Sequence, residues 1–339
     1  MTDTLDVLCA VDNGVGFITL NRPKALNALT LPMVRTVTAA LLAWREDRAV
    51  KAVVLHGSGD KAFCAGGDIR FFREAALAGA AVLDDFFTEE YALDHLVHVY
   101  PRPVIALMDG VVMGGGMGLS QGAGLRIVTE RSKLAMPETN IGLFPDVGGG
   151  YFLSRLEGQM GEYLALTGHA LSGREAVYHG LADLEVTAQH LPELLHALRT
   201  ERFDSDADVT RTVLALAGDD AGEPQHADSE SAFVDALLEL DDRITPHFGL
   251  GTALDIVQSL EADASPWAQH TAALLRKRSP LMLHVALEQV RRARSLSLED
   301  ALRMERDMMR NCFALRPGAA SEAVEGIRAL AVDKDHAPR

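Results

Sequence analysis

Cysteine, aromatic residues and surplus positive charge are all scarce in this sequence. Only three of its 339 residues are cysteine, and Cys9, Cys64 and Cys312 lie too far apart for a zinc-binding or disulfide framework. We therefore expect a reducing compartment and no bound metal. Aromatic residues make up 6% of the chain, and its formal net charge is -16. A nucleic-acid groove needs a basic face, so this charge argues against a nucleic-acid partner.

Long apolar runs are absent as well. A membrane-spanning helix needs a stretch of about 18 apolar residues or more, and the sequence contains none. Residues 1–6 carry Asp3 and Asp6, without the basic and then apolar order of a signal peptide. We therefore expect a cytoplasmic protein that has no membrane partner.

Short apolar runs alternate with helical patterns in the first half of the chain. Thr30 followed by Pro32 is typical of a helix start, and a second helix is predicted to begin near Asp68. Because strands alternate with helices, we predict a layered α/β core. The predicted strands are residues 15–20, 50–56, 104–108 and 126–129.

After about residue 195 the pattern becomes helical. We therefore divide the chain into an α/β core at residues 1–195, which carries the active site, and a mostly helical region at residues 196–339. Residues 202–242 are acidic and match no motif, so we assign no role to them.

Two segments combine small or acidic residues in a way that favours chemistry. KAFCAGGDIR, residues 61–70, follows a predicted strand, and its small residues let a ligand approach the backbone; alternatively, Asp68 only caps a helix. MPETNIGLFPDVGGG, residues 136–150, places Glu138 and Asp146 among apolar residues, which would raise a carboxyl pKa toward general acid–base use. The alternative is an exposed Glu138, with Asp146 as the N-cap of the helix that carries Tyr151.

A third segment, MGGGMGLSQG at residues 113–122, has two interpretations. Its G-L-S-Q-G part matches the nucleophile elbow of serine hydrolases, with Ser120 as the nucleophile. Its three consecutive glycines instead favour backbone N–H groups that hold an oxyanion. Glycines make a poor strand end and weaken a helix by about 1 kcal/mol each, so such a run indicates a close approach to the main chain.

These three segments, in this order, resemble the crotonase (enoyl-CoA hydratase/isomerase) superfamily. NRPKALNALT from Asn21 and LTGHALSGREAVYHGLADLE from Leu166 agree with it, so that the resemblance covers residues 10–190. It implies an α/β fold, a spiral of ββα units with a helical C-terminal region. It also implies an oxyanion hole for a thioester carbonyl, formed by the N–H groups of Gly67 and Gly115. Ser120 then becomes a packed helical residue.

The acidic residues indicate the branch within the superfamily. Hydratases carry a glutamate at the position of Gly118 and a second one at the position of Glu138, so the first hydratase acid is absent here. The chain is more similar to the 3-hydroxyisobutyryl-CoA hydrolases of the superfamily. That similarity implies Glu138 and Asp146 as catalytic carboxylates, with Glu90 as a further acid that, like Gly115, binds the substrate.

The resemblance implies hydrolysis of a short 3-hydroxyacyl-CoA thioester, with 3-hydroxyisobutyryl-CoA from valine breakdown as the first candidate. Coenzyme A is then part of the substrate, and we expect no cofactor. Its phosphates need local cations in an acidic protein, and the resemblance points to Arg22, Lys24 and Lys61.

Three other functions stay open at this point. They are an enoyl-CoA hydratase or isomerase of the same fold, a serine esterase, and an acyl-CoA-binding protein without catalysis. Members of the superfamily often self-associate, so a homo-oligomer is open too, although the sequence shows no interface.

Overall fold

The structure is a computed structural model that describes residues 5–220 and 227–339. Contacts between residues divide the chain into two units that alternate along the sequence. The first comprises Met1–Gly67, Thr88–Leu134 and Leu171–Glu223. The second comprises Asp68–Phe87, Ala135–Ala170 and Pro224–Arg339.

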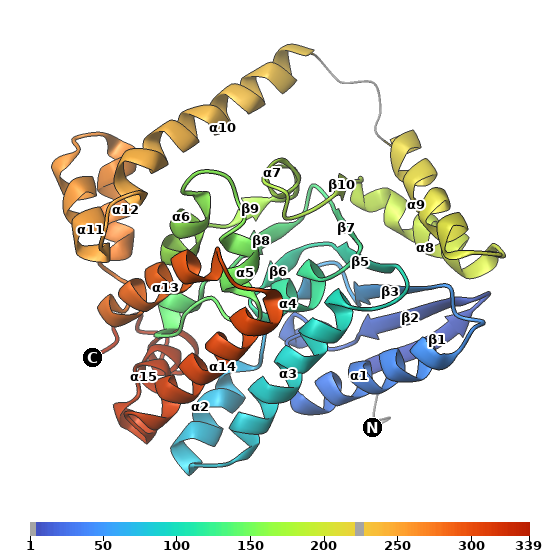
Figure 1. Cartoon of the computed structure of the whole chain (residues 1–339), viewed down its shortest axis with the longest axis horizontal. Helices are drawn as coiled ribbons and strands as arrows, with labels where there is room; N and C mark the ends of the chain where they lie inside the picture. Colours follow the sequence, from blue (N-terminus) through green and yellow to red (C-terminus); the bar gives the residue numbers. More distant parts are fainter. Residues whose placement is uncertain (1–4, 221–226) are drawn as a thin grey trace. The chain divides into compact units, whose positions relative to one another are not determined.

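A six-stranded sheet forms the centre of the first unit (Figure 1). The strands after the first hairpin pair in parallel and are largely buried, as expected for continuous apolar runs covered on both faces. In sheet order they are β1 (Val7–Asp12), β2 (Val15–Leu20), β3 (Ala52–Gly57), β5 (Val104–Met108), β7 (Leu125–Val128) and β10 (Leu184–Glu185). The predicted strands at residues 15–20 and 104–108 are confirmed. The predicted strands at residues 50–56 and 126–129 correspond to β3 and β7, and each begins within two residues of the predicted position.

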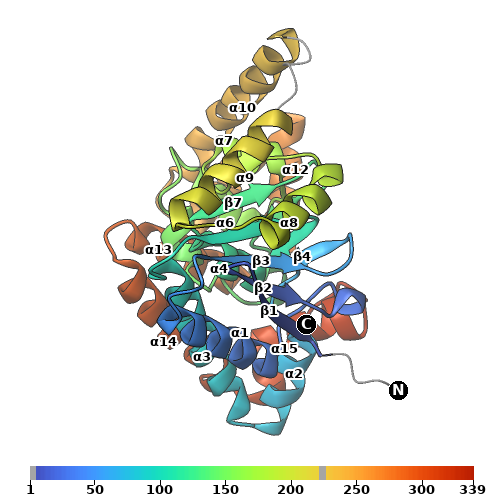
Figure 2. The same cartoon turned by 90° about the vertical axis from the view of Figure 1, so that its right-hand side faces the viewer.

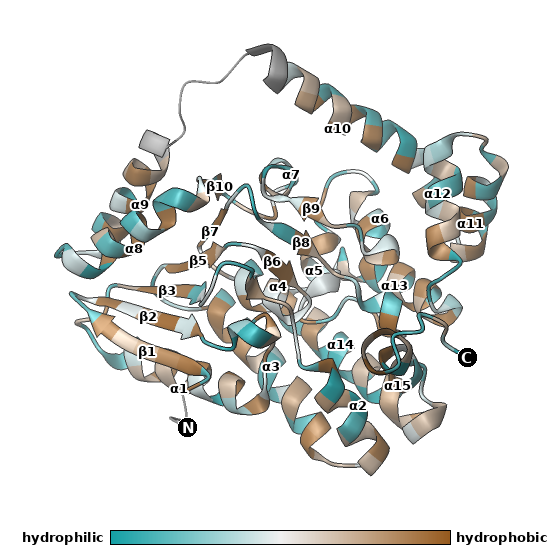
Figure 3. Ribbon diagram, turned by 180° about the vertical axis from the view of Figure 1, so that it is seen from behind, coloured by the Kyte–Doolittle hydropathy of each residue, from teal (hydrophilic) through white to brown (hydrophobic). Residues whose placement is uncertain are grey.

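Strand β1 was not predicted. It pairs antiparallel with β2 through a two-residue turn, in which Asn13 and Gly14 have φ values of 48° and 87°. Asn-Gly is a strong hairpin signal because both positions favour positive φ. The strand is apolar along its length in Figure 3, yet Leu8 and Val11 are exposed. A half-buried strand is predicted from alternating apolar and polar residues. Residues 7–12 do not alternate in this way, so their pattern does not predict a strand.

Two helices that follow the sheet cover one of its faces. Side chains of β2, β3, β5 and β7 pack against those of α8 (Leu191–Thr200) and α9 (Asp206–Asp220). Figure 2 shows the two helices beside the sheet. Phe17, Ile127 and Leu198 are members of this core. After β10 every element that the structure describes is helical, as the sequence predicts, but the first of these helices belong to the first unit.

A smaller sheet brings two glycine-containing turns to one edge. Its order is β4 (Ala62–Cys64), β6 (Val111–Met113), β8 (Lys133–Ala135) and β9 (Leu171–Ser172). Strands β4 and β6 are parallel neighbours, so their carboxyl ends lie at the same edge. The chain leaves β4 into residues 65–67 and leaves β6 into the glycine run at residues 114–116.

Helix starts follow the predicted caps. Thr30 caps α1 (Leu31–Glu46) through Met33 N, and Asp68 caps α2 (Ile69–Ala78) through Phe71 N. The unit division falls within α3 (Val82–His98). The first unit also holds η1 (Pro23–Ala25), α4 (Gly115–Gln121), α7 (Gly173–Tyr178) and η3 (Ala188–His190).

The second unit is helical. Its elements, besides α2, are η2 (Glu138–Ile141), α5 (Gly149–Leu153), α6 (Met160–Thr167), α10 (Ala227–Phe248), α11 (Ala253–Ala262), α12 (Pro266–Leu275), α13 (Pro280–Ala293), α14 (Leu298–Ala314), η4 (Gly318–Ala320), α15 (Glu322–Ile327) and η5 (Arg328–Val332). Within residues 5–220 and 227–339, no helix has the length and apolar character needed to span a bilayer. Cys9, Cys64 and Cys312 are not joined in disulfides, as expected.

Asn27 fixes the segment that leads to the turn at residues 65–67. Its side chain accepts from Arg22 N at 2.9 Å and donates to the carbonyls of Ala62 at 2.8 Å and Ser58 at 3.1 Å. The neighbouring backbone bonds that turn directly, since Leu29 N donates to Gly66 O at 2.8 Å. One fully buried amide thus joins η1 to β4.

Replacing Asn27 by alanine leaves the buried Ala62 carbonyl and two half-buried main-chain groups without this partner. We expect the free energy of unfolding to fall by about 2–4 kcal/mol, because an unpaired buried polar group costs about 1–3 kcal/mol. Denaturant unfolding followed by circular dichroism measures the loss. Asn13→Ala is the matched control: Asn13 also has positive φ, but its amide is exposed where it donates to Arg199 O. Equal losses in the two variants would contradict this assignment.

Candidate active site

Two glycine turns meet in the first unit. A Cβ atom added to Gly66, which has a φ of 97°, would lie 3.1 Å from Met113 O and 3.3 Å from Gly115 N. Only backbone fits between these turns. Within the described residues, no acceptor is recorded for the N–H groups of Gly67 and Gly115, and the N–H groups in the first turn of a helix have no acceptor inside it. The structure thus brings together the two turns that the resemblance assigns to an oxyanion hole.

Each glycine of the run at residues 114–116 is required for a different structural reason. Gly114 has φ 49° and ψ -121°, a conformation that residues with a Cβ avoid. A Cβ on Gly116 would lie 2.2 Å from the Cys64 carbonyl, and one on Gly115 would lie 2.4 Å from Glu90 Oε1. The first two constraints place α4 against β4, and the third leaves room for the Glu90 carboxyl against Gly115.

Glu90 belongs to the same part of the first unit. It lies on α3, is 2% exposed, and its carboxyl lies against Gly115. Burial, with smaller contributions from the charges of Glu90 and Asp94, raises the pKa of the Cys64 thiol to about 12. Cys64 is therefore a protonated packing residue and not a nucleophile.

Ser120 is not a nucleophile. It lies inside α4, is fully buried, and its Oγ donates to Gly116 O at 2.8 Å, one helical turn back. A nucleophile elbow would present this oxygen at a strand-to-helix turn. The expectation of a packed helical residue is confirmed, and the serine hydrolase interpretation is wrong.

The three cations suggested for coenzyme A differ in how they are used. Arg22 donates to Ala28 O at 2.6 Å and lies 3.8 Å from the Asp6 carboxylate, so its guanidinium serves the local fold. Lys24 and Lys61 are exposed. All three belong to the first unit, like Gly67 and Gly115.

Three of the buried carboxyl groups of the second unit influence one another. Glu138 on η2, Asp146 on the loop before α5, and Glu305 on α14 are 7%, 6% and 0% exposed. Burial raises the pKa of Glu138 well above its ordinary value, and the charges of Asp146 and Glu305 raise it further. Glu138 Oε2 has no hydrogen-bond partner within the part of the chain that the structure describes. The sequence correctly predicted Glu138 and Asp146 as buried carboxyls.

The loop that carries Asp146 is held by Glu305. The N–H groups of Gly148 and Gly150 donate to the two Glu305 oxygens at 2.7 and 2.9 Å. The N-cap of α5 is Gly148, with no side-chain cap, so the interpretation of Asp146 as that cap is wrong. Glu305 supplies the acceptors for these N–H groups instead.

Glu305 is the site residue that sequence reasoning missed. It lies on the buried stripe of α14 with Ala301, Leu302 and Met309. A carboxylate on an otherwise apolar helix stripe needs buried donors, and this was the available signal. The pattern gives no indication of the donors themselves.

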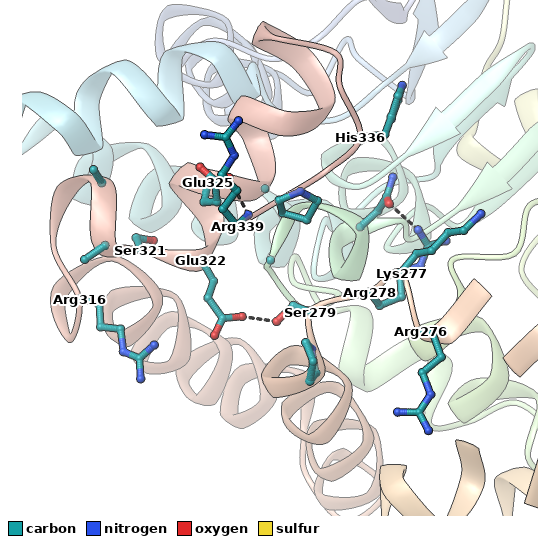
Figure 4. Close-up of a pocket in the computed structure, with 17 residues that line it drawn as sticks. Arg276, Lys277, Arg278, Ser279, Arg316, Ser321, Glu322, Glu325, His336 and Arg339 are labelled. Atoms are coloured by element: carbon teal, nitrogen blue, oxygen red, sulfur yellow. Dashed lines mark hydrogen bonds between the residues drawn. The ribbon is translucent and has the colours of Figure 1, made fainter. Parts of the chain in front are cut away.

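A cavity of about 590 Å³ in the second unit borders η2 (Figure 4). It is lined by Asn140 and Gly142 and by the link between α12 and α13. From that link Arg278 donates to Asn140 Oδ1 at 2.5 Å and to Thr167 O at 2.6 Å, and Ser279 Oγ donates to the Glu322 carboxylate. These bonds anchor the segment that carries Glu138. Among the described residues no group of three or more His, Cys, Asp or Glu side chains could hold a metal ion.

Curated relatives cover almost the whole chain. The protein named 3-hydroxyisobutyryl-CoA hydrolase, mitochondrial, from Gallus gallus is 41% identical over 337 residues, which is 98% of this chain and 84% of that protein. The protein of the same name from Homo sapiens is 38% identical over 334 residues, 98% of this chain and 83% of that protein. These names contradict the expected cytoplasmic location, which is therefore wrong by this comparison.

Solved structures share the fold. A carnitinyl-CoA dehydratase from Mycobacterium thermoresistibile has a TM-score of 0.85 and 40% identity, covering 97% of this chain and 91% of that one. An enoyl-CoA hydratase from Rhodobacter sphaeroides 2.4.1 has a TM-score of 0.82 and 37% identity, covering 99% and 92%. The sequence profile of enoyl-CoA hydratase/isomerase matches residues 15–339. The chain therefore belongs to the enoyl-CoA hydratase/isomerase (crotonase) family.

Proposed function

We propose that this protein hydrolyses a short 3-hydroxyacyl-CoA thioester, in the first place 3-hydroxyisobutyryl-CoA, to the free acid and coenzyme A. The observation that carries the proposal is the buried carboxyl of Glu138, with its raised pKa, beside Asp146. Relatives 41% and 38% identical along almost the whole chain carry the name of that hydrolase. Such a reaction belongs to valine breakdown.

The N–H groups of Gly67 and Gly115 stabilise the oxyanion that forms on the thioester carbonyl. Both are main-chain donors on glycine turns, and neither has a recorded acceptor among the residues described. Gly115 opens α4, whose N-terminus adds a partial positive charge. Removing one donor of an oxyanion hole typically costs about 10²–10³ in rate.

Glu138 acts on the carbonyl carbon either by activating water or by attacking it directly. In both routes the C–S bond breaks, and the coenzyme A thiolate leaves and takes up a proton, for which Asp146 is the donor or relay. Direct attack gives an anhydride with Glu138, which water then hydrolyses. The buried oxygen of Glu138 without a hydrogen-bond partner supports either role.

Binding roles fall to residues of the first unit. Glu90, whose carboxyl lies against Gly115, contacts the hydroxyl of the acyl group. The exposed Lys24 and Lys61 bind the phosphates of coenzyme A, and Arg22 supports the loop that carries Lys24. In this way local cations bind the phosphates of the substrate, although the chain as a whole is acidic.

A hydratase is the second candidate, favoured by the dehydratase and hydratase descriptions of two similar structures. Hydratases of the family use two carboxylates on one water. Gly118, inside α4, occupies the position of the first of them and provides no carboxylate. Hydrolysis therefore accounts better for the acids that are present.

A thiol-release assay tests the function. We expect free coenzyme A from 3-hydroxyisobutyryl-CoA and little turnover of crotonyl-CoA, with thiol followed by a chromogenic disulfide. Glu138→Gln should lower kcat by about 10²–10⁴, the usual contribution of a general base. Hydration of crotonyl-CoA without thiol release would establish the second candidate, and tight binding of both thioesters without turnover would establish a binding protein.

Gly115→Ala tests the oxyanion hole. Its Cβ would lie 2.4 Å from Glu90 Oε1, so the carboxyl or the turn must shift. We expect kcat/KM to fall by at least about 10²-fold, the effect of one lost donor. Gly124→Ala is the control, because its Cβ would have no neighbour closer than 3.8 Å. If steady-state kinetics give the same kcat/KM for both variants, the Gly115 amide has no part in catalysis.

The raised pKa of Glu138 predicts a pH-dependent gain in stability for Glu138→Gln. Above the ordinary pKa of 4.5 the folded protein keeps a proton that the unfolded chain has released, so the wild type loses stability as pH rises. The advantage of Glu138→Gln, measured by thermal unfolding between pH 5 and 8, should therefore grow with pH. Glu89→Gln is the control whose effect should not vary between pH 5 and 8: a hydrogen bond from Arg35 lowers the pKa of Glu89, so it is ionised in both the folded and the unfolded chain over this range. An advantage that stays flat would show that Glu138 is ionised without penalty.

A further inference from the structure

We propose that Glu305, assisted by Gln289, is the positioning residue for the reacting carboxyls: it grips the loop around Asp146 and holds the Asp146 carboxyl beside Glu138. The inference rests on the proposed function and deepens it. Glu305 itself contacts neither substrate nor reacting atoms in this proposal.

The loop is held on both sides of Asp146. After it, Gly148 N and Gly150 N donate to Glu305 Oε2 and Oε1 at 2.7 and 2.9 Å. Before it, Gln289 Nε2 donates to Pro145 O at 2.6 Å and also to Glu305 Oε1 at 2.9 Å. Successive backbone N–H groups around one carboxylate form an anion-binding nest, and here the anion belongs to the protein.

The conformation of the loop requires such a restraint. Val147 has a φ of 55° and Gly148 a φ of 86°. A β-branched residue at positive φ is a genuine outlier, and such strain persists only where the surroundings fix it. Without the Glu305 carboxylate the loop would relax, and Asp146, which directly precedes Val147, would move.

The Glu305–Gln289 pair is held rigidly because both side chains are buried between packed helices. Gln289 on α13 is 1% exposed and Glu305 on α14 is fully buried. Both helices pack against α5, which begins directly after the loop (Figure 1). The Gln289 amide orientation is fixed, because its NH₂ group faces two acceptors.

The charge of Glu305 adds a second effect on the reaction. Asp146 on the loop and Glu305 on α14 are the neighbouring charges that raise the pKa of Glu138 on η2. Asp146 also contributes to the raised pKa of Cys312 on α14, after burial, which dominates. Burial also raises the pKa of Glu305 itself, to about 8, although the N–H groups of Gly148 and Gly150 and the Gln289 amide oppose the shift. A neutral residue at position 305 therefore removes a charge that acts on Glu138 mainly above about pH 8.

Glu305→Gln and Gln289→Leu separate the two effects. In Glu305→Gln an NH₂ group replaces one acceptor, so we expect kcat to fall about 10- to 100-fold with KM within about threefold, as for a small misplacement of reacting groups. Because Glu305 is largely protonated below its pKa of about 8, the kcat/KM profile of Glu305→Gln should differ in shape from that of the wild type above about pH 8. Gln289→Leu keeps the titrating carboxyl at position 305. It should lower kcat and move that part of the profile to higher pH, because the Gln289 bond lowers the pKa of Glu305.

Hydrogen exchange by mass spectrometry measures the loop directly. The peptide that contains Gly148 and Gly150 should exchange at least about tenfold faster in Glu305→Gln than in the wild type, because the NH₂ group that replaces one acceptor leaves one of the two amides without its hydrogen bond. Glu299→Gln, an exposed acid on the same helix, is the matched control and should change none of these values.

Two results would overturn the inference. Unchanged exchange in Glu305→Gln would show that Glu305 does not hold the loop. Faster exchange with unchanged kcat and pH profile would show a purely structural brace. If the wild type releases no thiol, the proposed function fails, and the exchange rates then decide alone whether Glu305 holds the loop.

Discussion

Burying three carboxyl groups together is the constraint on which the second unit is built. Each group loses hydration and each repels the others, so the fold must supply donors or leave protons in place. It does so unevenly. Both oxygens of Glu305 accept from backbone or amide N–H groups, whereas Glu138 keeps one oxygen without a partner among the described residues. Burial raises the pKa of both groups, that of Glu305 to about 8, and the N–H donors around Glu305 oppose the shift there.

The first unit stabilises negative charge in a different way. Its donors are main-chain N–H groups, which do not titrate, and the nearby Cys64 and Ser120 side chains are unreactive. The Cys64 thiol is held protonated by burial, and the Ser120 hydroxyl is bonded within its own helix. In a chain of net charge -16, neutral backbone donors stabilise an oxyanion without adding a cation that nearby carboxylates would neutralise. The glycine run is needed because any side chain at Gly115 would strike Glu90.

What the sequence could predict was set by local signals. The glycine turns, the caps at Thr30 and Asp68, and the apolar surroundings of Glu138 and Asp146 all depend on neighbouring residues, and the structure agrees with them. The grip of Glu305 on Gly148 joins residues 157 positions apart, which no local pattern contains. For that reason the sequence alone leaves a helix cap open as the alternative role of Asp146, which its position favours and the structure excludes.

The replacement of Asp146 by Glu305 as the acceptor at the start of α5 affects the chemistry of this hydrolase branch of the family. An aspartate that caps a helix accepts from N–H groups at the start of that helix. Here Glu305 accepts from those groups, and Asp146 is a buried carboxyl that directly precedes the strained residue Val147. A chain that lacks an acid at Gly118 needs its second reactive carboxyl elsewhere. Glu305, which is distant in sequence, takes the helix-capping role that the position of Asp146 would favour. The site thereby has a second carboxyl without a new residue.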